Sequence, residues 1–193
     1  MWNPISSTSQ SPVDIAFIAF NTDDDKDFAI AALATIHPNA RLYFSENDTD
    51  DNGSFIGGES SITWLWVAKT ITAVTIIQLT DTYTNLNFRA SIGTISRSSS
   101  FKISSFKEGI IGYAGTDADT PSTYLAAILI GNDHSKLGPI DPDGIPLTAK
   151  RLSITTIAVI DNVTAHDGGK YTDSKSSQIV FSNYLTSIYD KTK

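Results

Sequence analysis

The sequence predicts an all-β protein, a β-sandwich of either jelly-roll or immunoglobulin-like topology. Short runs rich in β-branched and aromatic residues recur along its 193 residues, and clusters of Gly, Asp, Asn or Pro fill most gaps between them. A spacing of about 8 to 12 residues between such runs is typical of two packed sheets, because each strand buries one face against another layer. The predicted strands cover residues 13–20, 28–36, 40–45, 62–67, 71–79, 86–95, 101–106, 109–114, 124–130 and 152–160.

Residues 1–12 precede the first predicted strand and carry Pro4 and Pro12 among several Ser and Thr residues. Proline favours extended backbone in the residue before it, so we expect an extended N-terminal arm here. The remaining residues, 13–193, suffice for one substantial hydrophobic core. We therefore predict an arm followed by a single β-sandwich domain.

Two segments near the C-terminus depart from the strand pattern. Residues 137–148 contain Pro, Asp and Gly at a density that no strand interior tolerates, which predicts a crossover or an exposed loop. Within residues 176–190, Val180, Tyr184 and Ile188 recur at the spacing of one helix face. One short C-terminal helix packed on the sandwich is therefore predicted.

Composition and charge exclude several classes of protein. The formal net charge is -7 and the sequence pI is about 4.7, so we expect no binding to nucleic acid or to an anionic membrane surface. Because cysteine is absent, a disulfide scaffold, a thiol nucleophile and a thiolate metal site are all excluded. No window of about 20 apolar residues occurs, so we expect no membrane span.

Heavy use of Ser and Thr suits the solvent face of strands in a secreted protein. Asn-x-Ser/Thr sequons at Asn47, Asn52 and Asn162 are candidates for glycosylation in a eukaryotic secretory route. Such sequons also arise by chance in a sequence of this composition, so they favour an extracellular glycoprotein without requiring one.

The sharpest chemical pattern lies between the third and fourth predicted strands. It matches the calcium-loop template, with Asp, Asp, Asn and Gly at the first, third, fifth and sixth positions and Glu at the last. Calcium prefers about six to eight oxygen ligands, and alternate carboxylates on a tight turn supply them. Predicted strands flank the pattern, so we expect a Ca²⁺-stabilised β-loop, and the alternative is an acidic, solvated hairpin without metal. The candidate ligands are Asp48, Asp50, Asn52, Ser54 and Glu59.

No catalytic constellation is apparent in the sequence. The chain lacks a Gly-x-Ser-x-Gly elbow, and His37, His134 and His166 each lie beside a Pro or an Asp in a loop-like context. We therefore expect no enzymatic activity. Trp64 and Trp66 lie two apart on one predicted strand, so they share a face, which favours core packing over a sugar-stacking platform.

A series of motifs resembles a β-domain of large secreted and surface proteins, found in bacteria and in some algae. The order and spacing of the motifs agree with that domain over nearly the whole chain, although residues 68–73 replace a Gly-rich turn. The resemblance implies a surface or adhesive role without an assigned activity. The motifs cover residues 13–21, 27–29, 42–46, 53–55, 58–59, 62–64, 100–105, 109–115, 161–162 and 171–172.

The arm suggests how copies of the chain associate. We expect Trp2 and Ile5 to anchor it on the next copy and to complete the sandwich of that copy, and the alternative is an arm without a docking role. The predicted function is an extracellular structural protein, the self-assembling subunit of a filament, sheath or surface layer. The alternative is a module for calcium-dependent cell adhesion or for glycan binding.

Overall fold

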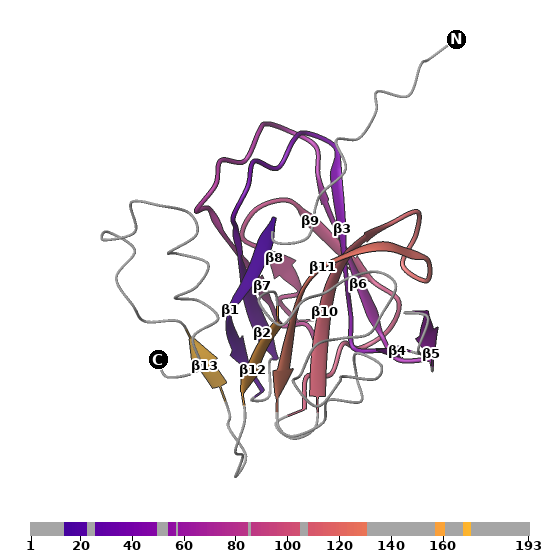
Figure 1. Ribbon diagram of the computed structural model, residues 1–193. Coiled ribbons are helices and arrows are strands. Elements are labelled where there is room, and N and C mark those ends of the chain that lie inside the picture. The colour runs from indigo at the N-terminus through magenta and orange to yellow at the C-terminus, as the bar shows by residue number, and fades with distance from the viewer. Residues whose placement is uncertain are drawn as a thin grey trace.

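The computed structural model shows a β-sandwich, which confirms the predicted fold class (Figure 1). The predicted arm over residues 1–12 and the predicted helix over residues 176–190 lie outside the described part of the chain. The structure describes residues 14–22, 26–49, 54–56, 58–84, 86–104, 108–130, 157–160 and 168–170.

The first sheet brings strands from both ends of the chain together. Its neighbouring strands are all antiparallel. A bulge between Phe17 and Ala19 interrupts the register of the pair formed by residues 15–21 and 27–32. In order across the sheet, its strands are β13 (Gly168–Lys170), β1 (Ile15–Asn21), β2 (Asp27–Ala32), β7 (Ile76–Thr80) and β8 (Arg89–Ala90).

The second sheet faces the first and is antiparallel except at one edge, where β11 (Pro121–Ile130) and β12 (Ile157–Ile160) run parallel. A small separate hairpin of β4 (Asp48–Thr49) and β5 (Phe55–Ile56) lies beside it. In order across the second sheet, its strands are β12 (Ile157–Ile160), β11 (Pro121–Ile130), β10 (Glu108–Gly115), β3 (Ala40–Ser45), β6 (Ser61–Trp66) and β9 (Thr94–Arg97).

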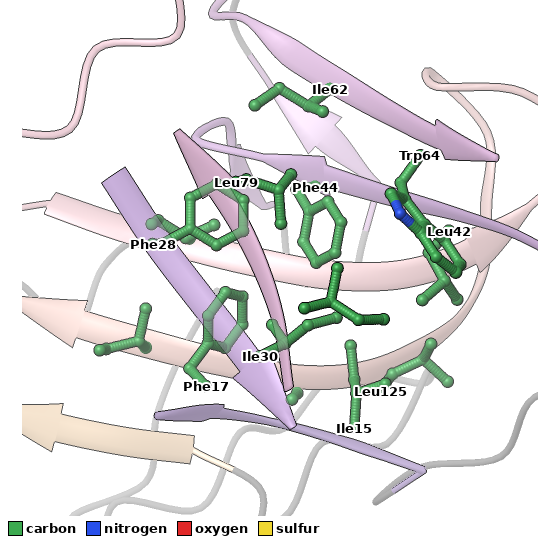
Figure 2. Packing of buried hydrophobic residues seen from close by; sticks show 14 of the residues in the cluster. Ile15, Phe17, Phe28, Ile30, Leu42, Phe44, Ile62, Trp64, Leu79 and Leu125 are labelled. Atoms are coloured by element: carbon green, nitrogen blue, oxygen red, sulfur yellow. The ribbon is translucent and has the colours of Figure 1, made fainter. Parts of the chain in front are cut away.

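The main core lies between the two sheets because alternate residues of each strand point to the same side. On β3, Leu42 and Phe44 point inward and are fully buried, while Tyr43 points to the opposite face. Phe28 from the first sheet meets Phe44 edge to face, with ring centroids 5.1 Å apart (Figure 2). Each large apolar side chain buried in this way contributes about 1.5 to 3 kcal/mol.

Trp64 is buried in this core, as its position in the sequence predicts (Figure 2). Its indole Nε1 donates a hydrogen bond to the carbonyl of Ile92, 2.7 Å away. Trp66 packs against the same core and is partly buried. Both tryptophans therefore serve packing in the described structure.

Two predicted strands take a different form. The strand predicted over residues 86–95 is divided into β8 and β9 by a bend at residues 91–93. Phe101 and Ile103 bury their side chains in the core, but residues 101–104 form no strand, because other groups bind their backbone amides. The amide of Phe101 donates to the carbonyl of Thr82, and that of Lys102 donates to the carboxylate of Glu46.

The bend between β8 and β9 depends on Gly93. Its φ of 83° lies in the left-handed region, and a Cβ atom here would lie 2.7 Å from Nε1 of Trp64 and 2.8 Å from the carbonyl oxygen of Leu65. We expect Gly93→Ala to lower the free energy of unfolding by about 2 to 4 kcal/mol, measured by urea denaturation. The matched control is Gly58→Ala, since a Cβ at Gly58 meets no atom within 4 Å. Equal losses in the two variants would contradict this role for Gly93.

Candidate functional site

The acidic segment predicted to bind calcium forms the β4–β5 hairpin. Asp48 pairs with Ile56 and Thr49 pairs with Phe55, so the two strands hold both ends of the connection over residues 50–54. The flanking elements are β3 and β6, as predicted, and no helix borders the hairpin on either side. The sequence pattern of a calcium loop is therefore built on a β-hairpin.

Asn47 closes the base of the hairpin. Its side-chain Oδ1 accepts a hydrogen bond of 2.9 Å from the amide of Glu59, and its Nδ2 donates to the carbonyl of Glu59 at 3.4 Å. The same Nδ2 donates to Oγ of Ser45 at 2.9 Å. These bonds fix the two strands that enter and leave the hairpin relative to each other.

The neighbouring Glu46 is buried and binds the backbone of two separate segments. Its Oε1 accepts a hydrogen bond from the amide of Ser60 at 3.2 Å, and its Oε2 accepts one from the amide of Lys102 at 2.9 Å. Hydrogen bonds from backbone amides satisfy an ionised carboxylate that has left water. Glu46 therefore joins the hairpin to the segment that follows β9.

The hairpin also covers a cluster of aromatic side chains on the outer face of the second sheet. Phe55 meets Tyr113 edge to face, with ring centroids 5.1 Å apart, and lies 6.1 Å from the ring of Tyr124. Tyr43 stacks on Tyr113 at 5.4 Å. Burial raises the pKa of Tyr113, and the nearby carboxylate of Asp119 acts in the same direction. Phe55 thus anchors the hairpin on the sheet.

The predicted calcium ligands are only partly within the described residues. Asp48 is half-buried on β4, whereas Ser54 and Glu59 are exposed. Asp50 and Asn52 lie outside the described residues. Among the residues that the structure describes, no three His, Asp or Glu side chains group together as a metal site. Calcium binding stays a prediction.

Among the predicted glycosylation and arm residues, the structure describes Asn47. Asn47 is only 7% exposed, and its amide nitrogen donates two hydrogen bonds, so the folded chain gives it a structural role, and its glycosylation stays a prediction. Asn52, Asn162, Trp2 and Ile5 lie outside the described residues.

A second buried carboxylate, Asp81, organises the loop between β7 and β8. It accepts hydrogen bonds from the hydroxyl and the amide of Thr84 and from the amide of Asn87. The bond from the Thr84 hydroxyl is the main reason why the pKa of Asp81 lies below its usual value. The amide of Asp81 in turn donates to Oδ1 of Asp27 at 2.8 Å.

Arg97 supports the same loop from β9. Its guanidinium donates to the carbonyls of Thr82 and Thr84, the latter at 2.6 Å, and lies over the ring of Phe88 with 4.6 Å to the centroid. Held in this way, the loop exposes Leu86, which is 86% accessible. Sequence patterns missed this feature because Leu86 was assigned to a strand. An Asp followed three residues later by a Thr, here Asp81 and Thr84, is the signal for a side-chain-bonded turn.

Comparison with protein-family models, with curated proteins and with solved structures gives no match. Over the described residues, no helix has the length and apolar character that crossing a membrane requires.

Replacing Glu46 tests its role at the base of the hairpin. In Glu46→Gln, one of the two backbone amides faces an NH₂ group in place of an oxygen, so we expect a loss of about 1 to 3 kcal/mol in unfolding free energy. Urea denaturation in calcium-free buffer measures the loss. Glu59→Gln is the control, since this side chain is exposed, and it should change stability by less than about 0.5 kcal/mol. A neutral Glu46→Gln variant would show that the carboxylate does not hold these segments together.

The lowered pKa of Asp81 predicts acid sensitivity. A carboxyl whose folded pKa lies below its unfolded value, about 3.9, stabilises the fold above that pH, and this contribution is lost as the pH falls through the folded pKa. Asp81→Asn should therefore be less stable than the wild type at pH 7, and the difference should shrink below about pH 4. Thermal unfolding between pH 7 and pH 2.5 measures both curves, and parallel curves would refute the assignment.

Proposed function

We propose that the protein is an extracellular structural protein whose copies assemble into a filament, a sheath or a surface layer. In this proposal it is secreted and has no enzymatic activity. The N-terminal arm of one copy docks on the sheet of the next, as an added strand. The observation that carries the proposal is the incomplete pairing of β1.

Within the described residues, one edge of β1 is paired along the strand and the other is paired over only part of it. On one side β2 pairs with β1 from Ile15 to Asn21. On the other side β13 pairs only with Ala19, Phe20 and Asn21. Among the strands of the described chain, none pairs with Ile15, Ala16 or Phe17 on that second edge.

A sheet edge is a template for a further strand. Ile15, Ala16 and Phe17 are buried within the chain, so an added strand here would have to displace what covers them. Strand addition supplies backbone hydrogen bonds for affinity, and alternate side chains fill pockets that give specificity. In the arm, Trp2 and Ile5 provide the large apolar side chains that such pockets accept. Because donor and acceptor lie on different surfaces, the contact is heterologous and repeats from copy to copy.

The second candidate is a calcium-dependent adhesive or glycan-binding module. The pairing of β4 with β5 favours it, because it holds an acidic sequence at the end of a hairpin. A calcium ion bound there would lie near Ile56 of the hairpin, which is 51% exposed. Calorimetric titration of calcium, and a glycan array probed with and without a chelator, test this candidate.

Removing residues 1–12 tests the arm. We expect the truncated protein to stay folded and monomeric in sedimentation velocity, while the full chain forms regular assemblies in electron micrographs at rising concentration. Assembly by the truncated protein would exclude arm docking.

A peptide of residues 1–12 makes the test more specific. It should bind the truncated protein, and a peptide with Trp2→Ala and Ile5→Ala should bind at least about 10-fold more weakly. Equal binding of the two peptides would remove Trp2 and Ile5 from the contact. A full chain that remains monomeric under every condition would contradict the structural function and favour the adhesive module.

A further inference from the structure

The outer face of the first sheet, turned away from the main core, is apolar near the start of β1. Ala16 of β1 and Ala31 of β2 are direct partners across the two strands, so their side chains share one face. Their neighbours Ile15, Phe17 and Ile30 point the other way, into the main core (Figure 2). Ala16 and Ala31 therefore lie on the outside of the sandwich.

This outer face is nevertheless covered. Ala16 and Ala31 are 0% exposed, and Leu33, which follows β2, is 3% exposed. They form an apolar cluster separate from the main core, with Ile18 packed against it, and we call these four residues the outer cluster. Within the described chain, all of its apolar side chains come from β1, from β2 or from the residue after β2. A sheet face of this kind is buried against a further layer of structure.

The direction of β13 indicates which part of the chain supplies that layer. β13 pairs antiparallel with β1 at the edge of the sheet, and its last residue, Lys170, lies opposite Ala19 (Figure 1). The chain at Lys170 therefore heads along the edge of β1 toward Ile15, the end at which Ala16 lies. Residues 171–193 continue the chain from this point.

The sequence of residues 176–190 suits such a position. At the helical spacing predicted for this segment, most of its large apolar side chains share one face, whereas Ser182, Asn183 and Thr186 lie on the opposite face. A helix of this length measures about 22 Å, enough to cross neighbouring strands at a spacing of about 4.8 Å. The apolar face comprises Val180, Phe181, Tyr184, Leu185 and Ile188.

We propose that residues 176–190 form a helix that packs its apolar face on the outer cluster of the same chain. The helix removes from water an apolar surface that would otherwise be exposed, and it supplies the cover that the outer cluster has. The N-terminal arm also adjoins this end of β1, but Pro4 and Pro12 disfavour a helix within it.

The docked helix also bears on assembly, and this part of the inference rests on the proposed function. Its connection to Lys170 places it beside Ile15, Ala16 and Phe17, which have no partner strand on the second edge of β1 within the described chain. Release of the helix from the sheet therefore uncovers the stretch at which the arm of another copy adds as a strand. In the free protein the helix acts as a cover that leaves before the arm binds.

Disulfide trapping in the full-length protein tests the docking, because the chain has no cysteine of its own. Ile76→Cys places a thiol on the same face of the sheet, since Ile76 is the cross-strand partner of Ala31 and is 38% exposed. A second cysteine is then introduced in turn at each position from 178 to 190. We expect oxidation to join the two cysteines within one chain at positions that recur every three or four residues.

Arg41→Cys is the matched control for Ile76→Cys. Arg41 is exposed on β3 between the core residues Ala40 and Leu42, so it lies on the outer face of the second sheet. It should form no disulfide within one chain at any position of the segment. Equal trapping by Ile76→Cys and Arg41→Cys, or trapping by neither, would overturn the docking.

Three other outcomes of the trapping would each contradict the proposal. Disulfides found without a period of three or four residues would show that the segment is not a helix. Disulfides found only between two chains, on a gel without reductant, would make a second copy the occupant of the outer face. A disulfide between Ile76→Cys and Ser7→Cys, with none to residues 178–190, would assign the cover to the N-terminal arm.

A second measurement separates the docking from its effect on assembly. Tyr184→Ser and Ile188→Ser together remove two side chains from the apolar face. We expect the Ala31→Cys thiol, at a position that is fully buried, to react with a thiol reagent at least about 10-fold faster in this double variant. Thr186→Ala changes the opposite face and should leave the rate unchanged. An unchanged rate in the double variant would overturn the docking.

The same double variant, with Ala31 restored, should assemble at a lower concentration than the wild type, measured by sedimentation velocity and electron microscopy. A faster thiol reaction with unchanged assembly would leave the docking in place and exclude the helix as a cover for the arm site. A wild type and a double variant that both stay monomeric, with periodic disulfides from Ile76→Cys, would contradict the proposed function and leave the docking standing.

Discussion

The buried carboxylate of Glu46 joins the segment after β9 to the end of the β3–β6 ladder. Its two oxygens bind the amide of Ser60, where β6 is about to begin, and the amide of Lys102, between two core side chains. The bond to Lys102 fixes the backbone between Phe101 and Ile103, whose side chains enter the core. The end of β3, the base of the β4–β5 hairpin and the segment after β9 therefore depend on one side chain.

A second buried carboxylate, Asp81, binds backbone in the same way. Asp81 satisfies amides inside its loop, and Arg97 satisfies two carbonyls of that loop from a neighbouring strand. Carboxyl and guanidinium side chains thus bind backbone groups in this protein where the chain leaves a sheet. The irregular segments held in this way carry large apolar side chains. Phe101 is buried in the core, whereas Leu86 is exposed.

Local sequence patterns predict the strands that pair along their full length. They fail where side chains, rather than a neighbouring strand, bind the backbone amides. The alternation of residues 40–45 gives β3 with the observed bounds, because that strand is central and buried on both faces. The alternation of Phe101 and Ile103 looks the same in the sequence, yet the partner of that segment is Glu46, far away in the chain. The calcium-like spacing correctly placed a loop between β3 and β6. It could not reveal that Asn47 and Glu46 are used to build the base of that loop, since this depends on tertiary contacts with residues 59, 60 and 102.

The pairing of β1 with β13 has a consequence for how the chain acquires its structure. The partners Asn21 and Gly168 are far apart in the sequence, so this edge of the first sheet closes only after residues 168–170 have been synthesised. During that interval the whole edge of β1 is open to strands from other molecules. Folding at low local concentration would favour closure within the chain, whereas folding near many nascent copies would favour exchange between them. The order of synthesis therefore sets a period in which intramolecular and intermolecular pairing compete for the same strand.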